Sequence, residues 1–379
     1  MSKPKLTFVV ESGTDVRMVE GFAERFELTI LGRQISNGVI ISQPPTVSVE
    51  LVTGPESRWR FGRFVQQEIA RRSAATDFIL VQGYGIAALA ANRVARRLGK
   101  RSMMLVCSPV EEYYLQRKLR PFPGKPFRRR ELAALGAIAR INARIGQQYC
   151  VLSGHLEKTV RGHGTRLPVH VIPIYGVDTS RFSPPAVDRT LLRRHVGLPE
   201  NDPIIFFSSR VAPEKDSETL LRAILVLRQS GRRVTVLHRS GGHRDFAALA
   251  SEVGVADQVI ATDAVRPGED LARDYQASDI CVQASRAEGL GFSVLEAMAC
   301  ETPVVASATG GLKETVVDGV TGLTYPVGNA QVLADRIAQI LDHPDDAVAM
   351  AKRSRRMVME RFEARDLFDK FERLVTSNG

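Results

Sequence analysis

Short apolar runs alternate with amphipathic stretches along the first half of the chain. Runs of four or five apolar residues favour buried strands, and apolar positions at helical spacing favour the helices between them. The expected strands are residues 6–10, 28–31, 78–81 and 103–106, and a turn at 12–15 is expected to cap a helix over 16–26. Strands alternating with helices in this way indicate a mostly parallel sheet with helices on both faces.

The second half repeats this pattern more regularly. Strands are expected at residues 203–207, 234–237, 280–282 and 303–305. A helix is expected from Asp216, because it carries one apolar stripe, made of Leu220, Leu221, Ile224 and Leu227. The tail from about Asp346 has many helix formers and reads as one or two helices.

Proline and glycine gather between the two halves, at residues 171–178 and at Pro184-Pro185. This density is typical of a linker, and 379 residues exceed the size at which one core keeps growing. We therefore expect an α/β protein with two Rossmann-like domains, residues 1–176 and 177–352. The last helices, 353–379, are expected to pack back towards the N-terminal domain.

Composition is that of an ordinary globular protein, with 44% hydrophobic and 25% charged residues. No stretch approaches the roughly 18–20 apolar residues of a membrane-spanning helix. The apolar run at 6–10 is too short for a secretory signal and is followed by Glu11, so a cytoplasmic protein is expected. The scattered cysteines favour neither a zinc site nor a disulfide framework; they are Cys107, Cys150, Cys281 and Cys300.

Positive charge is concentrated in the first half. Residues 1–176 hold 27 Lys/Arg and 13 Asp/Glu, whereas the remainder holds 25 and 29. The stretch Arg117–Arg130 has seven cations, no acid and two phenylalanines, and its prolines favour a loop. Two functions fit this stretch: peripheral docking on the inner face of an anionic membrane that carries a lipid-linked acceptor, or direct binding of a phosphorylated acceptor. The alternative is an exposed loop with no partner. Nucleic acid is disfavoured, because no recognised fold accompanies the charge.

The segment 285–300 carries the richest chemistry. It follows an expected strand and leads into a helix whose start is marked by two glycines, so Glu288 is expected on the loop and Glu296 within the helix. Glu288 could then reach a sugar, Glu296 could accept hydrogen bonds from a ribose, and the first helical N–H groups could meet a diphosphate. The alternative is that Glu288 only complements the helix dipole and Glu296 lies on the surface.

Two further loops follow strands of the same half. Residues 208–215 place Arg210 and Lys215 where they could neutralise a leaving diphosphate. Residues 303–314 join a strand to a helix start through Gly310-Gly311, whose amides could cradle an anion. Each loop alone could be a surface ion pair or a tight turn, but three at successive strand ends favour a site.

In these residues the chain resembles the retaining, family 4-like glycosyltransferases, of which glycogen synthase and phosphatidylinositol mannosyltransferase are the types. Their E-x7-E motif matches Glu288 and Glu296, their Arg-x4-Lys pair matches Arg210 and Lys215, and their double-glycine segment matches Gly310-Gly311. The resemblance covers nearly all of the second half. In the first half it rests mainly on a glycine after the first strand, at residue 13.

The resemblance implies the GT-B fold, in which two Rossmann-like domains face each other across a cleft. It implies transfer of a sugar from a nucleotide-diphosphate donor, UDP more often than GDP, to a hydroxyl of a glycan, lipid-linked or small-molecule acceptor, with retention at the anomeric carbon. The implied catalytic residues are Glu288, Arg210 and Lys215. The implied donor-binding residues are Gly13, Arg210, Lys215, Glu288, Gly289, Leu290, Gly291, Phe292, Glu296, Thr309, Gly310 and Gly311.

Several positions depart from the family pattern. Ile174-Tyr175 interrupts the linker motif, Glu301 and Lys313 replace a usual glycine and proline, and residues 238–240 replace a glycine-rich strand end. No histidine precedes His155, although some relatives place one beside the reacting sugar. The matching strand end instead offers acceptor-contact candidates or a helix cap, namely Glu111, Glu112 and Tyr113.

No Asp-x-Asp occurs in the chain, so no metal and no cofactor is expected, and protein cations would replace the metal. Two other functions remain open. A non-hydrolysing sugar-nucleotide epimerase shares this architecture, and a catalytically inactive nucleotide-binding subunit could retain it.

Overall fold

The computed structural model describes residues 3–35, 40–42, 45–119, 127–263 and 269–377. Contacts divide the chain into two compact units. The first comprises Met1–Glu111, Arg128–Tyr175 and Ala364–Gly379, and the second comprises Glu112–Phe127 and Gly176–Glu363.

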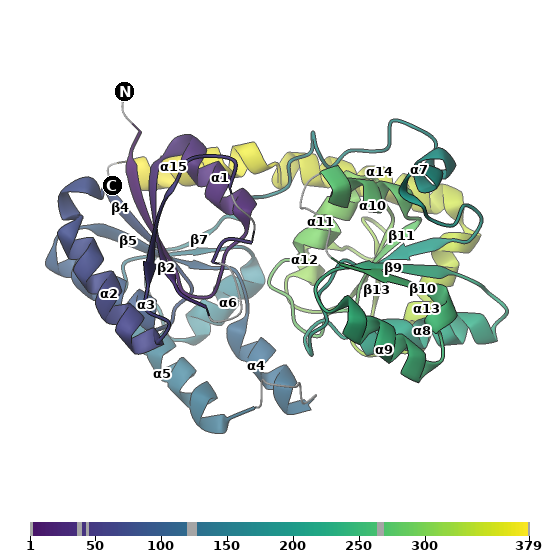
Figure 1. The fold of residues 1–379 in the computed structure, drawn as a ribbon, viewed down its shortest axis with the longest axis horizontal. Helices are drawn as coiled ribbons and strands as arrows, with labels where there is room; N and C mark the ends of the chain where they lie inside the picture. The colour runs from purple at the N-terminus through teal and green to yellow at the C-terminus, as the bar shows by residue number, and fades with distance from the viewer. Residues whose placement is uncertain (1–2, 36–39, 43–44, 120–126, 264–268, 378–379) are drawn as a thin grey trace. The chain divides into compact units, whose positions relative to one another are not determined.

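The first unit is built on a seven-stranded, fully parallel sheet (Figure 1). The strand order is β3-β2-β1-β4-β5-β6-β7. In the centre, Phe8 lies opposite Ile30 and Leu80, and all three are fully buried. The strands are β1 (Lys5–Val10), β2 (Glu27–Arg33), β3 (Glu50–Gly54), β4 (Phe78–Gln82), β5 (Arg101–Val106), β6 (Tyr149–Val151) and β7 (Val169–Val171).

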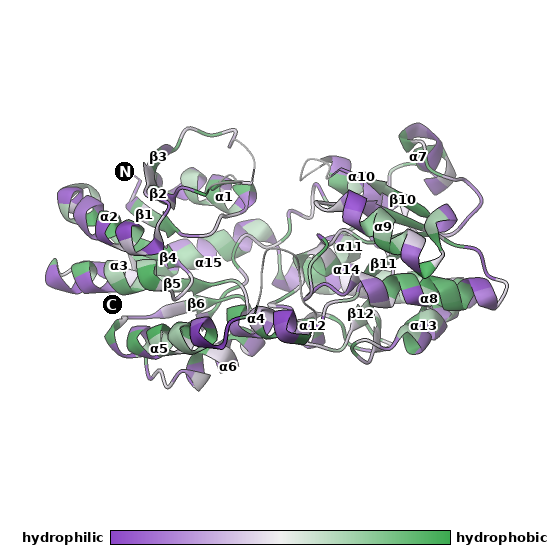
Figure 2. Cartoon of the chain, turned by 60° about the horizontal axis from the view of Figure 1, so that its bottom comes forward, coloured by the Kyte–Doolittle hydropathy of each residue, from purple (hydrophilic) through white to green (hydrophobic). Residues whose placement is uncertain are grey.

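Helices cover both faces of this sheet. Figure 1 shows α1 and α15 on one side and α2, α3 and α5 on the other. The bounds are α1 (Val16–Arg25), α2 (Arg58–Arg71), α3 (Ile86–Arg97), α5 (Arg129–Ile145), α6 (Gly154–Gly162) and α15 (Ala364–Thr376), with a 3-10 turn at Ser73–Ala75. Helix α4 (Val110–Leu119) spans the division between the units. The alternating purple and green of α2 and α3 in Figure 2 reflects one apolar face towards the sheet and one polar face outward.

Helix α15 belongs to the first unit although it ends the chain. It packs on α1 through aromatic rings, with Phe22 lying 5.6 Å from Phe368 and 5.3 Å from Phe371 between ring centroids. Asp15 caps α1 by accepting a hydrogen bond from the backbone N–H of Arg17 at 2.9 Å. The capping turn read from the sequence is therefore confirmed.

The second unit has a six-stranded parallel sheet in the order β10-β9-β8-β11-β12-β13. Its strands are β8 (Ile204–Phe206), β9 (Thr235–Arg239), β10 (Val259–Thr262), β11 (Ile280–Gln283), β12 (Val304–Ser307) and β13 (Leu323–Tyr325). The order reverses beside β8, because the chain moves from β8 outward to β9 and β10 and then returns to β11. Such a switch point is where open α/β sheets form their ligand crevice.

Helices also cover both faces of the second sheet, with α8, α9 and α13 on one side and α10, α11 and α14 on the other (Figure 1). The apolar stripe predicted for the helix after Asp216 is confirmed, because all four of its residues are buried in the core. The bounds are α7 (Arg189–Val196), α8 (Ser217–Gln229), α9 (His243–Val253), α10 (Glu269–Ala277), α11 (Phe292–Ala299), α12 (Leu312–Thr315), α13 (Ala330–Asp342) and α14 (Pro344–Arg361), with a 3-10 turn at Ala256–Gln258.

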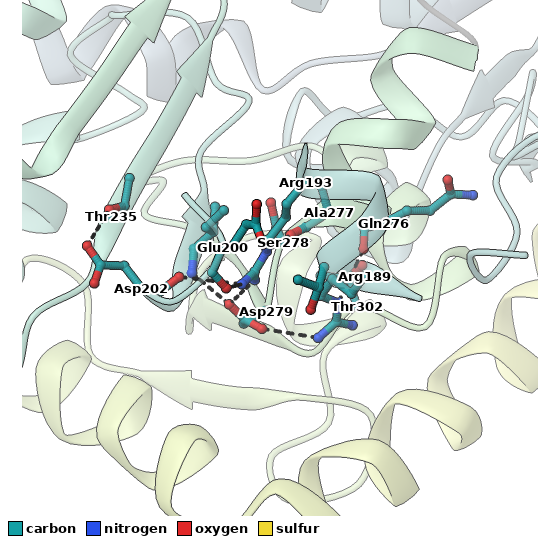
Figure 3. Close-up of polar contacts among 12 residues, drawn as sticks. Arg189, Arg193, Glu200, Asp202, Thr235, Gln276, Ala277, Ser278, Asp279 and Thr302 are labelled. Carbon is teal, nitrogen blue, oxygen red and sulfur yellow. Dashed lines mark hydrogen bonds and ion pairs between the residues drawn. The ribbon is translucent and has the colours of Figure 1, made fainter. Parts of the chain in front are cut away.

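A partly buried polar cluster fixes α7 to the amino ends of β8 and β11 (Figure 3). The Arg193 guanidinium is buried and pairs with Asp279, which also accepts from Arg189 at 3.1 Å and from the Ile204 backbone N–H at 2.6 Å. Arg193 donates further to the Ala277 carbonyl at 2.8 Å. Because this cluster lies at the amino ends of the strands, it stabilises the scaffold at the edge opposite to their carboxyl ends.

Most elements expected from the sequence are present within two residues of their predicted ends. The loop expected over Arg117–Arg130 is wrong at both ends, because residues 117–119 belong to α4 and Arg129 begins α5. Its centre, residues 120–126, lies outside the described residues. Among the described helices, none is both long and apolar enough to cross a membrane. All four cysteines are free, and only Cys107 is not fully buried.

Candidate functional site

Three loops meet at the carboxyl edge of the second sheet. Strand β11 pairs with β8 on one side and with β12 on the other, and all three are parallel. The loops that follow them therefore begin at the same edge. They are residues 207–216, 284–291 and 308–311, which hold most of the donor-site candidates of the sequence.

Glu288 lies at the centre of these loops. It precedes α11, as predicted, and its residue exposure is only 8%. Its Oε2 accepts hydrogen bonds from the Lys215 ammonium at 2.5 Å, from Ser285 at 3.0 Å and from Gln283 at 3.1 Å. Its Oε1 accepts from the Gly289 backbone N–H at 3.3 Å. The carboxylate is therefore held in one orientation by donors from two neighbouring strands and their loops.

The protonation state of Glu288 follows from these donors. Burial alone would raise the pKa of the carboxyl group, because it penalises the charged form. The charge of Lys215 and the hydrogen bonds from Lys215, Ser285 and Gly289 outweigh burial, so the pKa of Glu288 is held below its ordinary value. Glu288 is consequently an ionised hydrogen-bond acceptor at neutral pH.

The two cations of the loop after β8 have different environments. The Lys215 side chain is 15% exposed and pairs with Glu288, so its charge stabilises the carboxylate. The Arg210 side chain is 51% exposed and pairs with the buried Glu214. Arg210 is thus the more accessible of the two cations, whereas Lys215 lies deeper in the site.

Glu296 is buried inside α11 and does not lie on the surface. Its exposure is 3%, and its Oε2 accepts a hydrogen bond from the Tyr275 hydroxyl at 3.0 Å. The same hydroxyl lies 3.3 Å from the Ser208 Oγ, and burial raises the pKa of Tyr275 well above its ordinary value. This chain of contacts joins α10, α11 and the loop after β8. The surface alternative considered for Glu296 is therefore wrong, and its contact with a ribose stays a prediction.

The double glycine supports the Glu288 loop directly. A Cβ on Gly310 would lie 2.1 Å from the Glu288 carbonyl oxygen, and one on Gly311 would lie 2.1 Å from the Gly289 carbonyl oxygen. The Gly311 backbone N–H donates to the Glu288 carbonyl at 3.0 Å, and the Thr309 hydroxyl donates to the Arg286 carbonyl at 3.0 Å. The amide of Gly311 is thus used within the protein, and the proposed anion cradle stays a prediction for the other amides.

Arg286 and Asp216 form a second ion pair that sequence reasoning missed. The Arg286 Nε lies 2.9 Å from Oδ2 of Asp216, whose side chain is fully buried. The Arg286 backbone N–H also donates to the Glu214 carbonyl at 2.8 Å. These contacts fix the loop after β11 against the loop after β8. No motif in the sequence pairs these two residues, because 70 positions separate them.

The remaining candidates lie on the loop around Phe292 and in the first half of the chain. Leu290 is buried and Gly291 adopts a φ of 93° as the N-cap of α11, which begins at Phe292. Gly13 has a φ of 94°, as expected of a glycine in a tight turn after β1. Its contact with a donor is untested.

Glu111 belongs to a polar cluster in the first unit. Its carboxylate accepts a hydrogen bond from the Tyr84 hydroxyl and lies 2.9 Å from the His163 Nε2. Burial acts to raise the pKa of Glu111, but the hydrogen bonds from His163 and Tyr84 outweigh it and lower the pKa. A histidine therefore does lie beside this strand end, although it comes from 52 positions further along the chain. Glu112 and Tyr113 occupy the first turn of α4, and their role stays a prediction.

Among the described residues, no group of three or more His, Cys, Asp or Glu side chains is arranged to hold a metal ion.

Family and curated comparisons match mainly the second half of the chain. Residues 188–357 match the family model described as glycosyl transferases group 1. A D-inositol 3-phosphate glycosyltransferase from Xylanimonas cellulosilytica is 37% identical over 193 residues, 49% of this chain and 46% of that protein. A GDP-mannose-dependent alpha-(1-6)-phosphatidylinositol monomannoside mannosyltransferase from Mycolicibacterium smegmatis is 34% identical over 202 residues, 50% of this chain and 52% of that protein. The matches thus span about half the length of these relatives.

Solved structures match both units. The sucrose-phosphate synthase of Thermosynechococcus elongatus has a TM-score of 0.81 at 21% identity and covers 98% of each chain. The Anabaena protein Alr3699/HepE, solved with UDP and glucose, has a TM-score of 0.78 at 19% identity and covers 99% of this chain and 100% of its own. At these identities the likeness establishes the fold. Residues 188–357 are therefore a glycosyl transferases group 1 domain, carried by a chain with two Rossmann-like domains of the GT-B type.

Proposed function

We propose that this chain is a retaining glycosyltransferase that moves a sugar from a nucleoside-diphosphate donor to an acceptor hydroxyl. The observation that carries the proposal is the ionised, buried Glu288, paired with Lys215 at the switch point of the second sheet. The accessible cation Arg210 lies on the same loop as Lys215. A donor of this kind requires a carboxylate that accepts hydrogen bonds from the sugar hydroxyls and, beside it, cations that bind the diphosphate.

The charges of the site suit the departure of a nucleoside diphosphate. Breaking the bond between the anomeric carbon and the phosphate oxygen builds negative charge on the phosphate and positive character on the sugar ring. Arg210 and Lys215 would stabilise the phosphate, and the first N–H groups of α11 would add a positive helix end. Because Glu288 is ionised, it would accept hydrogen bonds from the sugar and would not serve as a general acid.

Retention follows, in this proposal, from attack on the face that the phosphate leaves. The acceptor oxygen forms its bond to the anomeric carbon as the carbon–phosphate oxygen bond breaks. The acceptor proton passes to the departing phosphate oxygen, so no protein base is needed. The sequence lacks an Asp-x-Asp motif, which supports protein cations in place of a metal ion.

UDP is the favoured nucleotide, and GDP is the competing one. Support for UDP comes from the solved neighbour Alr3699/HepE, which was crystallised with UDP-glucose. The mannosyltransferase among the curated relatives is named as GDP-mannose-dependent. Both nucleotides therefore belong in the assay.

An anionic or lipid-linked acceptor fits the basic end of α4. Leu115 and Leu119 are exposed there, at 42% and 69%, beside Arg117 and Lys118. Exposed leucines with neighbouring cations are typical of peripheral contact with anionic membranes. Co-sedimentation with phosphatidylglycerol vesicles tests this part: binding that falls as salt rises is expected, and no binding at low salt would remove the membrane from the proposal.

The function itself is tested with UDP- and GDP-sugars by following release of the free diphosphate with and without candidate acceptors. Replacing Glu288 by Gln keeps the size of the side chain and removes its charge, so turnover should fall by about 100-fold or more. The matched control is Glu252→Gln on the exposed surface of α9, which should leave turnover unchanged. Unchanged turnover in Glu288→Gln would refute the role assigned to this carboxylate.

A further inference from the structure

A cavity of about 680 Å³ lies beside the edge strand of the first sheet, remote in sequence from the loops around Glu288. One wall is formed by β7 and the residue after it, and the other by the last turns of α15. Both elements belong to the first unit. The lining residues are His170, Val171, Ile172, Lys370, Arg373, Leu374, Thr376 and Ser377.

Among the described residues that line this cavity, three have basic side chains and none has an acidic one. Lys370 and Arg373 lie one turn apart on α15, and His170 faces them from β7. In the part of the chain that the structure describes, no ion pair involves Lys370 or Arg373. Burial and the charge of Lys370 both lower the pKa of His170, which places the lysine within electrostatic reach of the imidazole.

Two acids of α15 contact a different partner. Asp369 pairs with Arg25 of α1 at 2.7 Å, and Glu372 lies 4.0 Å from the same guanidinium. These two acids therefore face Arg25 of α1, whereas Lys370 and Arg373 line the cavity. Among the described lining residues no acid offsets Lys370 and Arg373, so the cavity wall carries positive charge.

The carboxyl end of α15 does not oppose that potential. Arg101 donates hydrogen bonds to the carbonyls of Val375 at 3.0 Å and Ser377 at 3.1 Å. It thereby neutralises the negative end of the helix dipole. The hydroxyls of Thr376 and Ser377 donate to carbonyls of their own helix. The cations and His170 are therefore the groups left to recognise a ligand.

We propose that this cavity binds a small organic phosphate, with the phosphate on Lys370, Arg373 and His170. The organic part would lie against the apolar wall formed by Val171, Ile172 and Leu374. The volume is within the range of small-molecule sites, and two cations with an imidazole match a dianionic phosphate. The site is independent of the proposed sugar donor, because it lies in the first unit and uses none of the residues around Glu288.

The test follows His170 by NMR in protein labelled with ¹³C-histidine, with the signal assigned through His170→Gln. Phenyl phosphate and inorganic phosphate are the probes. A bound dianion should raise the pKa of His170 measurably, and phenyl phosphate should bind more tightly than phosphate because of the apolar wall. The variant Lys370→Gln/Arg373→Gln should weaken binding of phenyl phosphate by tenfold or more.

Matched controls separate this site from general charge effects and from the donor site. Lys352→Gln/Arg356→Gln removes two exposed cations of α14 in the other unit and should leave the affinity unchanged. Glu288→Gln should also leave it unchanged, even though we expect that variant to lower sugar transfer about 100-fold. No response of His170 to either probe, or equal affinity in the Lys370/Arg373 variant, would overturn the proposal. Equal affinity for phosphate and phenyl phosphate would remove the organic part of the ligand.

Discussion

Replacing Gly311 by alanine should destabilise the second unit by displacing the loop that carries Glu288. The backbone of Gly311 has a φ of −69°, which alanine adopts without strain. Its Cβ would nevertheless lie 2.1 Å from the Gly289 carbonyl oxygen and 2.8 Å from the Leu290 Cα. The cost of this substitution is therefore steric, and it arises against backbone that cannot rotate away.

The magnitude follows from the displacement required. Ordinary contact begins at 3.4 Å, so the loop must move by about 1.3 Å. Overpacking of this kind costs about 1–3 kcal/mol, and stretching the hydrogen bond from Gly311 to Glu288 adds about 1 kcal/mol. We expect a loss of about 2–4 kcal/mol, which corresponds to a decrease in Tm of roughly 4–16 °C for a unit of this size.

Two other glycines separate the steric term from the conformational one. Gly319 has a φ of 70° and nothing within 4 Å of an added Cβ, so Gly319→Ala should cost only about 1–2 kcal/mol. Gly310 has both a φ of 46° and the 2.1 Å contact, so Gly310→Ala should be the most harmful of the three. Thermal unfolding followed by calorimetry gives the order. A Gly311→Ala variant as stable as Gly319→Ala would refute the argument that these glycines hold the Glu288 loop.

Three further outcomes are expected. Lys215→Met should lower the free energy of unfolding at pH 7 by about 3 kcal/mol in urea, because it leaves the Glu288 carboxylate buried without its cation. Adding Glu288→Gln should restore most of this loss. A double variant as unstable as Lys215→Met would contradict the pairing. Asp279→Ala should cost about 3–5 kcal/mol in thermal unfolding, because the buried Arg193 guanidinium loses its carboxylate, and a loss below 1 kcal/mol would show that the cluster is not structural. Burial lowers the pKa of His238 to about 4, so the imidazole binds a proton more tightly in the unfolded chain than in the folded protein. The free energy of unfolding, compared with that of His238→Phe, should be constant above pH 7 and fall by about 3 kcal/mol between pH 6.5 and 4. A difference that does not change with pH would contradict the burial of a neutral His238.

Local pattern accounts for the success of the sequence in predicting the fold. The buried strands and the helix after Asp216 were predicted because their apolar positions repeat with the period of their own secondary structure. The loop position of Glu288 and the helical position of Glu296 were predicted because two glycines mark a helix start. The prediction of a loop over Arg117–Arg130 was wrong at both ends, because prolines break a helix only near their own positions and do not prevent helices on either side.

Contacts between distant segments account for what the sequence did not reveal. Tyr275 reaches Glu296 across 21 positions, and His163 reaches Glu111 across 52. Neither pair has a characteristic spacing, because strand order and helix packing bring them together. The same holds for Asp216, whose ion pair with the loop after β11 depends on β8 and β11 being neighbours.

Calorimetric titration with UDP, GDP and ADP tests most directly whether the loops around Glu288 hold a nucleoside diphosphate. We expect UDP to bind, with an affinity that falls tenfold or more in Arg210→Ala, because the accessible guanidinium would contact the diphosphate. Arg222→Ala on α8, an exposed arginine of the same unit that also pairs with a glutamate four positions away, should bind UDP like the unchanged protein. No binding of any of the three nucleotides, or the same affinity in Arg210→Ala, would contradict a donor site at the carboxyl edge of the second sheet.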